Sequence, residues 1–141
     1  MAHFETTIDI AAPPERVWAV MSNLERWPEW TQSMSRVERL NDRPLGVGSR
    51  VRVKQPRLAA AVFDITSWNP PRGFDWVAQN PLVTAVASHD IAPSAAGSRV
   101  RLSVTFSGPL GGVIAWFYGS LTQRYVQMEA EGLRRRAEKP A

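Results

Sequence analysis

The sequence has 141 residues, 44% of them hydrophobic, which is the size and composition of one globular domain with a full core. It contains no cysteine, which excludes disulfide bonds, a thiolate nucleophile and cysteine-ligated metal sites. The net charge of +4 is a modest excess of the kind that commonly serves solubility. The N-terminus has no basic segment followed by an apolar run, and no apolar stretch reaches the roughly 18 residues of a membrane span. We therefore expect a soluble, cytoplasmic protein without a secretory signal or stable membrane insertion.

The first quarter of the chain predicts a strand followed by two short helices. Apolar or small side chains alternate with polar ones over residues 4–10, and the Ala-Ala-Pro-Pro run at 11–14 ends the strand. Pro14 suits the first turn of a helix. A second short helix is expected from Leu24 to Trp27, where Pro28 would end or kink it.

From about residue 35 the periodicity changes to two, and turn sequences rich in proline, glycine and asparagine, the first at 41–44, separate six further segments. The expected strands are 35–40, 49–55, 60–68, 74–79, 84–91 and 99–107. The last has the clearest pattern, which turns Val100, Leu102, Val104 and Phe106 toward a core and Arg99, Arg101 and Ser103 toward water. Short connections favour an antiparallel meander.

The C-terminal part returns to a helical pattern. A helix from about residue 110 to 137 would be about 40 Å long, and arginines near its end complement the helix dipole. We expect its apolar stripe to pack across the concave sheet. The stripe comprises Leu110, Val113, Ile114, Phe117, Leu121, Tyr125 and Met128. Residues 1–138 are expected to form one domain, with a frayed tail at 139–141.

This order of elements carries a family resemblance. The segments Ile-Asp-Ile-Ala-Ala-Pro-Pro-Glu-Arg-Val-Trp at 8–18 and Trp-Pro-Glu-Trp at 27–30 resemble the polyketide cyclase/dehydrase and lipid-transport branch of the START-like (SRPBCC) superfamily. Gly-Val-Gly-Ser-Arg-Val at 46–51 and Trp-Asn-Pro-Pro-Arg at 68–72 add support, so the resemblance covers nearly the whole chain. It implies an α+β helix-grip fold, in which a seven-stranded curved antiparallel sheet wraps around the long C-terminal helix.

The resemblance also implies a cavity between sheet and helix. Its relatives bind lipids, sterols, polyketides or plant hormones, and a few catalyse cyclisation; no motif here selects among these activities. Aromatic side chains from separate elements, together with two isolated polar groups, are the candidate ligand contacts. These are Trp30, Phe63, Trp76, His89, Phe106, Phe117, Leu121 and Arg124.

Several candidates have a structural alternative. Core packing alone could explain Phe117 and Leu121. Arg124 lies within the helical stripe, so it either covers apolar surface with its stem while the guanidinium reaches water, or it meets an acidic ligand group. His89 is the one internal histidine, and its neighbour Asp90 points to the opposite face of a strand, so the two do not form an acid–base dyad.

The leading hypothesis is a binding or carrier protein for a small hydrophobic molecule, such as a lipid or polyketide, without a catalytic residue, a metal site or a cofactor. The alternative is an aromatase/cyclase-type enzyme acting on a polyketide-like substrate, with His89, Arg124 or Tyr125 assisting proton movement. A third possibility is association with nucleic acid or an anionic membrane. The basic residues involved would be Arg50, Arg52 and Lys54 together with the arginines at 134–136. No aromatic platform accompanies them in the sequence, so we expect no nucleic-acid partner. A monomer and a homodimer are both open.

Overall fold

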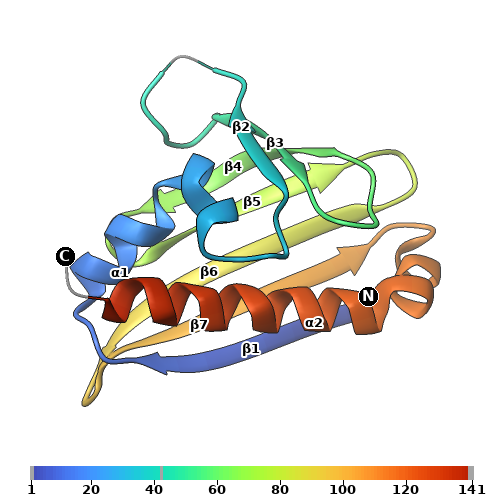
Figure 1. Cartoon of the computed structure of the whole chain (residues 1–141). Coiled ribbons are helices and arrows are strands. Elements are labelled where there is room, and N and C mark those ends of the chain that lie inside the picture. The colour runs from blue at the N-terminus through green and yellow to red at the C-terminus, as the bar shows by residue number, and fades with distance from the viewer. Residues whose placement is uncertain (1, 42, 140–141) are drawn as a thin grey trace.

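The computed structural model describes residues 2–41 and 43–139; Asp42 of the expected turn at 41–44, and residues 140–141 of the expected tail, lie outside them. A seven-stranded antiparallel sheet curves around one long helix, which confirms the α+β helix-grip prediction (Figure 1). The strands are β1 (Ala2–Ile10), β2 (Arg36–Arg39), β3 (Arg50–Lys54), β4 (Ala61–Asn69), β5 (Gly73–Gln79), β6 (Thr84–Ser94) and β7 (Gly97–Ser107). The helices are α1 (Pro14–Met21), the 3₁₀ helix η1 (Leu24–Glu29) and α2 (Gly111–Glu138).

The strand order is β1-β7-β6-β5-β4-β3-β2, so β2 to β7 form the expected meander and β1 joins beside β7. The hairpin between β6 and β7 is tighter than the sequence indicated. Both strands extend toward it, to Ser94 and from Gly97, because Gly97 adopts φ = 135°, a conformation open to glycine. A side chain there would also meet the backbone of Ala12, which follows β1.

The alternation predicted for β7 is largely confirmed. Val100 and Leu102 are buried, and Arg99 and Arg101 are exposed. Ser103 is the exception, because it is buried although it lies on the outer face. It is paired with Glu5 of β1 on one side and Ser88 of β6 on the other.

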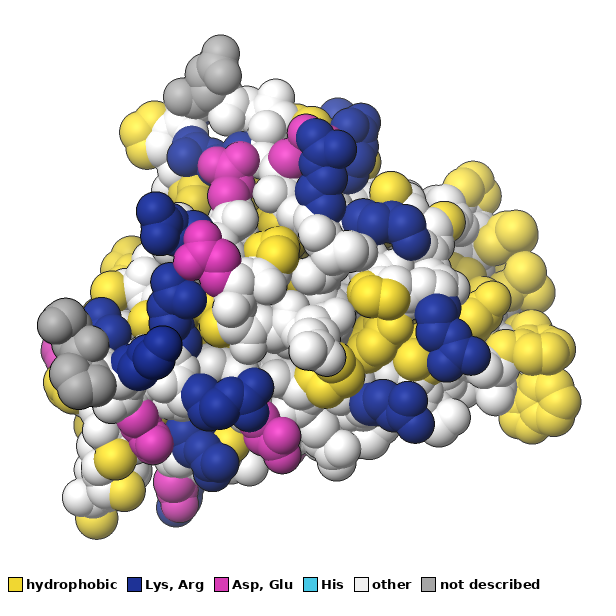
Figure 2. Space-filling view, viewed as in Figure 1, with side chains coloured by type: hydrophobic (Ala, Val, Ile, Leu, Met, Phe, Trp, Pro, Cys, Tyr) yellow, Lys and Arg dark blue, Asp and Glu magenta, His cyan; other side chains and the backbone are white. Residues whose placement is uncertain are grey.

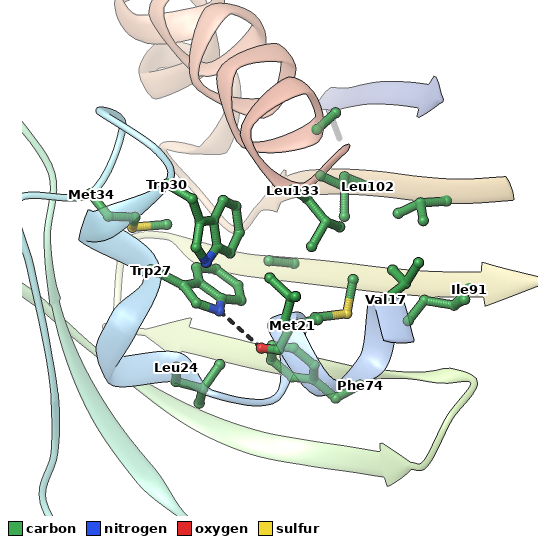
Figure 3. Close-up of a cluster of buried hydrophobic side chains, with 14 of the residues drawn as sticks. Val17, Met21, Leu24, Trp27, Trp30, Met34, Phe74, Ile91, Leu102 and Leu133 are labelled. Carbon is green, nitrogen blue, oxygen red and sulfur yellow. Dashed lines mark hydrogen bonds between the residues drawn. The ribbon is translucent and has the colours of Figure 1, made fainter. Parts of the chain in front are cut away.

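The hydrophobic core lies where α1 and η1 cover the sheet beside the C-terminal half of α2. Figure 3 shows Trp27 of η1 beside Trp30, the residue that follows this helix, with Trp27 directed toward Met21 of α1 and Phe74 of β5. The indole Nε1–H of Trp27 donates to the Met21 carbonyl at 2.9 Å, which satisfies a fully buried polar group. This bond ties the two short helices together beneath α2.

The packing face of α2 differs from the predicted stripe. Phe117 is 66% exposed, so its predicted core position is wrong. The buried helix residues are Gly111, Gly119, Tyr125, Val126, Ala130, Gly132, Leu133 and Ala137. This face is rotated from the predicted one by one to two residues, or roughly 100 to 200°. Small residues on the buried side let α2 approach its neighbours closely: a Cβ at Gly132 would lie 2.0 Å from the carbonyl oxygen of Trp30.

Within the described ranges, none of the helices combines the length and the apolar character that crossing a bilayer requires.

Candidate functional site

A cavity of about 210 Å³ lies between the concave face of the sheet and the middle of α2. Most of its walls are apolar side chains of β3 to β7, and α2 closes the remaining side. The lining residues are Met34, Val53, Gln55, Leu58, Ala59, Ala61, Phe63, Trp76, Ala78, Ala85, Ala87, Ser88, His89, Leu102, Ser103, Val104, Phe106, Thr122, Tyr125, Val126 and Glu129. An apolar chamber with a few polar groups is typical of a small-molecule site.

The hollow exists because alanines stand on the inner face of the central strands. Ala78 of β5 pairs with Ala85 of β6, and Ala85 pairs with Phe106 of β7. One row deeper, Ala87 lies between Trp76 and Val104 in the same way. Methyl groups under the helix leave a volume that larger side chains would have filled.

The deep end of the cavity holds a buried pair of ionisable side chains from two elements. His89 of β6 and Glu129 of α2 approach to 3.5 Å between Nε2 and Oε1, and their side chains are 4% and 12% exposed. The other ring nitrogen of His89, Nδ1, lies 3.1 Å from the Phe74 carbonyl oxygen. Asp90 points outward and pairs with Arg101 at 3.3 Å, so the prediction that His89 and Asp90 form no dyad is confirmed.

The Phe74 carbonyl decides where the proton of His89 lies. A carbonyl oxygen only accepts, so Nδ1 must carry a hydrogen and donate it. In a neutral imidazole the lone pair would then be on Nε2, facing the carboxylate of Glu129. Nε2 is therefore the ring nitrogen that faces Glu129, and the two side chains form one polar end of the cavity wall.

Neighbouring aromatic rings fix the orientation of His89. Its imidazole stacks on Phe74 with ring centroids 4.2 Å apart and planes 8° from parallel. Trp27 and Trp76 present their rings at 5.6 Å, steeply inclined to the imidazole. Gly73 lets the two strands meet here, because a Cβ at this position would lie 1.8 Å from the His89 carbonyl oxygen. The imidazole is therefore held by packing before any ligand arrives.

The cavity opens beside the connection between β3 and β4. Ala59 of this connection lines the cavity and is also exposed, and Leu58 next to it is half-buried. The Tyr125 hydroxyl of α2 donates to the Pro56 carbonyl, which fastens the connection to the helix. Because Tyr125 also lines the cavity, this contact joins the connection to the cavity wall.

The eight residues expected at the site divide into two groups. Phe63, Trp76, His89 and Phe106 line the cavity, and their role toward a ligand remains a proposal. Trp30, Phe117, Leu121 and Arg124 are absent from the lining. Trp30 is buried against Trp27, with ring centroids 5.4 Å apart, in the core behind the cavity.

The remaining three residues lie off the cavity because α2 is rotated from the predicted face. Phe117 and Arg124 are exposed, and Leu121 is half-buried away from the lining. The same rotation brings in Glu129 and Thr122, which the sequence reasoning missed. A helix face drawn through the small residues Gly119 and Ala130 would have included both.

Two surface carboxyl groups, Glu29 and Glu5, have lowered pKa values. A hydrogen bond from Arg136, 2.8 Å away, lowers the pKa of the Glu29 carboxyl, and Arg26 acts in the same direction. A hydrogen bond from His3 lowers the pKa of Glu5. In residues 2–41 and 43–139, no group of three or more histidine, aspartate or glutamate side chains is placed to hold a metal ion.

Comparison with known proteins agrees with this architecture. A crystal structure of a protein from Thermus thermophilus superimposes with a TM-score of 0.79 at 19% identity, covering 96% of this chain and 97% of the other. The Zhui aromatase/cyclase of a Streptomyces species superimposes with a TM-score of 0.78 at 17% identity, covering 97% and 93%. At these identities the likeness shows a shared fold.

Curated sequences give a shorter match. An uncharacterised protein of Mycobacterium bovis is 27% identical over 67 residues, which are 48% of this chain and 40% of that protein. The chain thus spans well under two thirds of the length of the curated relatives it matches. The family model described as "Polyketide cyclase / dehydrase and lipid transport" matches residues 1–138. With that match over nearly the whole sequence and the helix-grip fold around an apolar cavity, the chain belongs to the polyketide cyclase/dehydrase and lipid-transport family.

Proposed function

We propose that this protein binds one small hydrophobic molecule between its sheet and α2. The observation that carries the proposal is the cavity of about 210 Å³, with alanine and aromatic walls and one polar end. Apolar contact supplies affinity, and the His89–Glu129 pair orients a polar group of the ligand.

The volume favours a compact ligand. Dry apolar cavities of roughly 150 Å³ bind benzene, so this one suits a molecule of one or two rings, or a short branched chain. A polyketide with several fused rings or a long acyl chain would need its walls to move. Because Glu129 accepts hydrogen bonds when ionised, a hydroxyl or amine is the polar group that fits the deep end.

The test combines native mass spectrometry with a cavity-filling variant. Native mass spectrometry of the purified protein would detect a co-purifying small molecule, and a neutral naphthalene fluorophore would report saturable binding. Ala85→Leu places a larger side chain into the cavity from β6. Ala92→Leu makes the same change on the same strand at an exposed position, and is the matched control. At least tenfold weaker fluorophore binding in Ala85→Leu alone supports the proposal, and equal binding by all three proteins refutes it.

A second candidate is an aromatase/cyclase-type enzyme acting on a small polyketide-like substrate, and the buried His89–Glu129 pair favours it. Such a pair could take a proton from the carbon beside a ketone and return it to an oxygen. Arg124 is no longer a candidate for this role, because it is exposed and does not line the cavity. Tyr125 lines the cavity and stays a candidate.

Turnover separates the two candidates. A short poly-β-ketone would be incubated with wild-type protein and with Glu129→Gln, a nearly isosteric variant, and products followed by mass spectrometry. Product from the wild type that Glu129→Gln fails to form supports the enzyme. Saturable binding of the ketone with no change in it supports the carrier.

A further inference from the structure

The N-terminal end of α2 exposes large apolar side chains that no described part of the chain covers. Trp116 is 80% exposed, Phe117 66% and Tyr118 41%. With aromatic side chains of roughly 150 to 250 Å² each, these three alone present about 300 to 450 Å² of ring surface. Exposed apolar patches of this size on a monomer usually mark an interaction site.

Aliphatic residues enlarge the surface. Val113 and Leu110 belong to the same end of α2, and Leu82 comes from the neighbouring β5–β6 connection. The Leu110 N–H donates to the Leu82 carbonyl at 2.9 Å. This bond joins the β5–β6 connection to the β7–α2 connection at one end of the molecule. We call the six residues the aromatic end: Leu82, Leu110, Val113, Trp116, Phe117 and Tyr118.

This end lacks charge of its own and is bordered by positive charge. Residues 76–88 and 102–123 contain no Asp, Glu, Lys or Arg. In Figure 2 the hydrophobic side chains gather where α2 begins, and the charged side chains in view beside them are basic. Arg124 lies seven residues after Phe117, two turns further along the same helix face.

A second exposed arginine, Arg57, belongs to the connection that α2 holds. The bond from Tyr125 to Pro56 joins the chain neighbours of Arg124 and Arg57, so the two arginines come from segments in direct contact. Within the described residues neither has a carboxylate within ion-pair distance, whereas Arg50 pairs with Asp64. Arg52 of β3 is likewise paired, with Glu38. Two of the three β3 residues that the sequence suggested for an anionic partner are thus engaged with carboxylates, whereas in the part of the chain that the structure describes Arg57 and Arg124 are not.

We propose that the aromatic end docks on the surface of an anionic lipid bilayer, with Arg57 and Arg124 against the headgroups. Tryptophan and tyrosine favour the membrane–water interface, and each basic residue near an anionic surface adds attraction. The docking is peripheral, because only one helix end and one connection enter the interface. It places the cavity entrance next to the membrane, although the proposal does not depend on what the cavity binds.

Vesicle sedimentation tests the proposal. Wild-type protein should bind vesicles of equal parts phosphatidylcholine and phosphatidylglycerol, and bind pure phosphatidylcholine much more weakly. Trp116→Ser with Phe117→Ser should weaken binding at least tenfold, while Val47→Ser, at a residue 70% exposed elsewhere, should not. Arg57→Gln and Arg124→Gln should each cost about fivefold, with the exposed Arg72→Gln as control.

Fluorescence and oligomeric state supply independent readouts. Trp116 emission should shift to the blue on adding anionic vesicles, and Trp116→Phe should lose the shift but still sediment with them. Wild-type protein that ignores anionic vesicles would overturn the proposal. A lipid-free dimer that dissociates in Trp116→Ser would also overturn it, since a second copy would then cover the aromatic end.

Discussion

Replacing Gly132 by alanine tests how closely α2 and η1 are packed. In an exposed helix interior this change would stabilise the protein by about 1 kcal/mol, because alanine loses less backbone entropy than glycine. At Gly132 the same substitution should instead destabilise the protein. The added Cβ would lie 2.0 Å from the Trp30 carbonyl oxygen and 3.1 Å from the Trp30 ring, so η1 must move by about an ångström or more.

The expected net effect is a loss of about 2 kcal/mol, from an overpacking cost of about 3 kcal/mol less the helix gain. Gly112→Ala in the same helix is the matched control: its Cβ meets nothing within 4 Å, and it should stabilise by about 0.5 kcal/mol. Urea titrations would give both values, and Gly132→Ala should lower Tm by roughly 6 to 10 °C. A Gly132→Ala protein as stable as Gly112→Ala would refute the close packing of η1 on α2.

Three further outcomes are expected. Phe117→Ala should change the free energy of unfolding by less than about 1 kcal/mol in urea titration, because the ring is 66% exposed; a loss of about 3 kcal/mol would place it in a core. Trp27→Phe should cost about 2 to 4 kcal/mol, since it removes the indole bond to the buried Met21 carbonyl and leaves a void; an unchanged urea midpoint would contradict that contact. Arg136→Gln should raise the pKa of Glu29 toward 4.5 in an NMR titration, and a Glu29 pKa that does not move would exclude Arg136 as the cause. Because the folded-state pKa of Glu29 is lowered, the stabilisation from this pair is present at neutral pH and should fade as the pH drops below about 4.5.

The sheet was accessible from the sequence because its signals are local. Strict alternation fixes which side of β7 is buried, and Pro14 marks the start of α1 with a residue whose φ is already helical. The order of β2 to β7 follows from their connections, which favour pairing of consecutive strands, whereas the pairing of β1 with β7 is not local in sequence. Ser103 is the exception, because alternation gives the face on which a side chain lies and not how far neighbouring strands cover it.

The candidate site was less accessible because it depends on the rotation of α2. Hydrophobicity pointed to the face with Phe117, whereas the buried face of α2 carries Gly119, Ala130 and Leu133. Because the helix is rotated from the predicted orientation, Thr122 and Glu129 line the cavity, and Leu121 and Arg124 do not. The acidic partner of His89 was therefore hidden until the helix was placed, although the histidine itself was a candidate from the start.

The two halves of α2 explain why the hollow and the aromatic end occur together. In the C-terminal half, Leu133 and Ala137 face the sheet and are buried, so that half completes a filled core with η1. In the N-terminal half the large side chains, such as Trp116, face outward. The inward side there has Gly119 against Phe4 and, further along, Thr122 over the cavity. Small residues on the inner side of this half, together with the alanines of β5 and β6, leave room for a ligand. The large apolar side chains of the same half face outward and supply a surface for a partner.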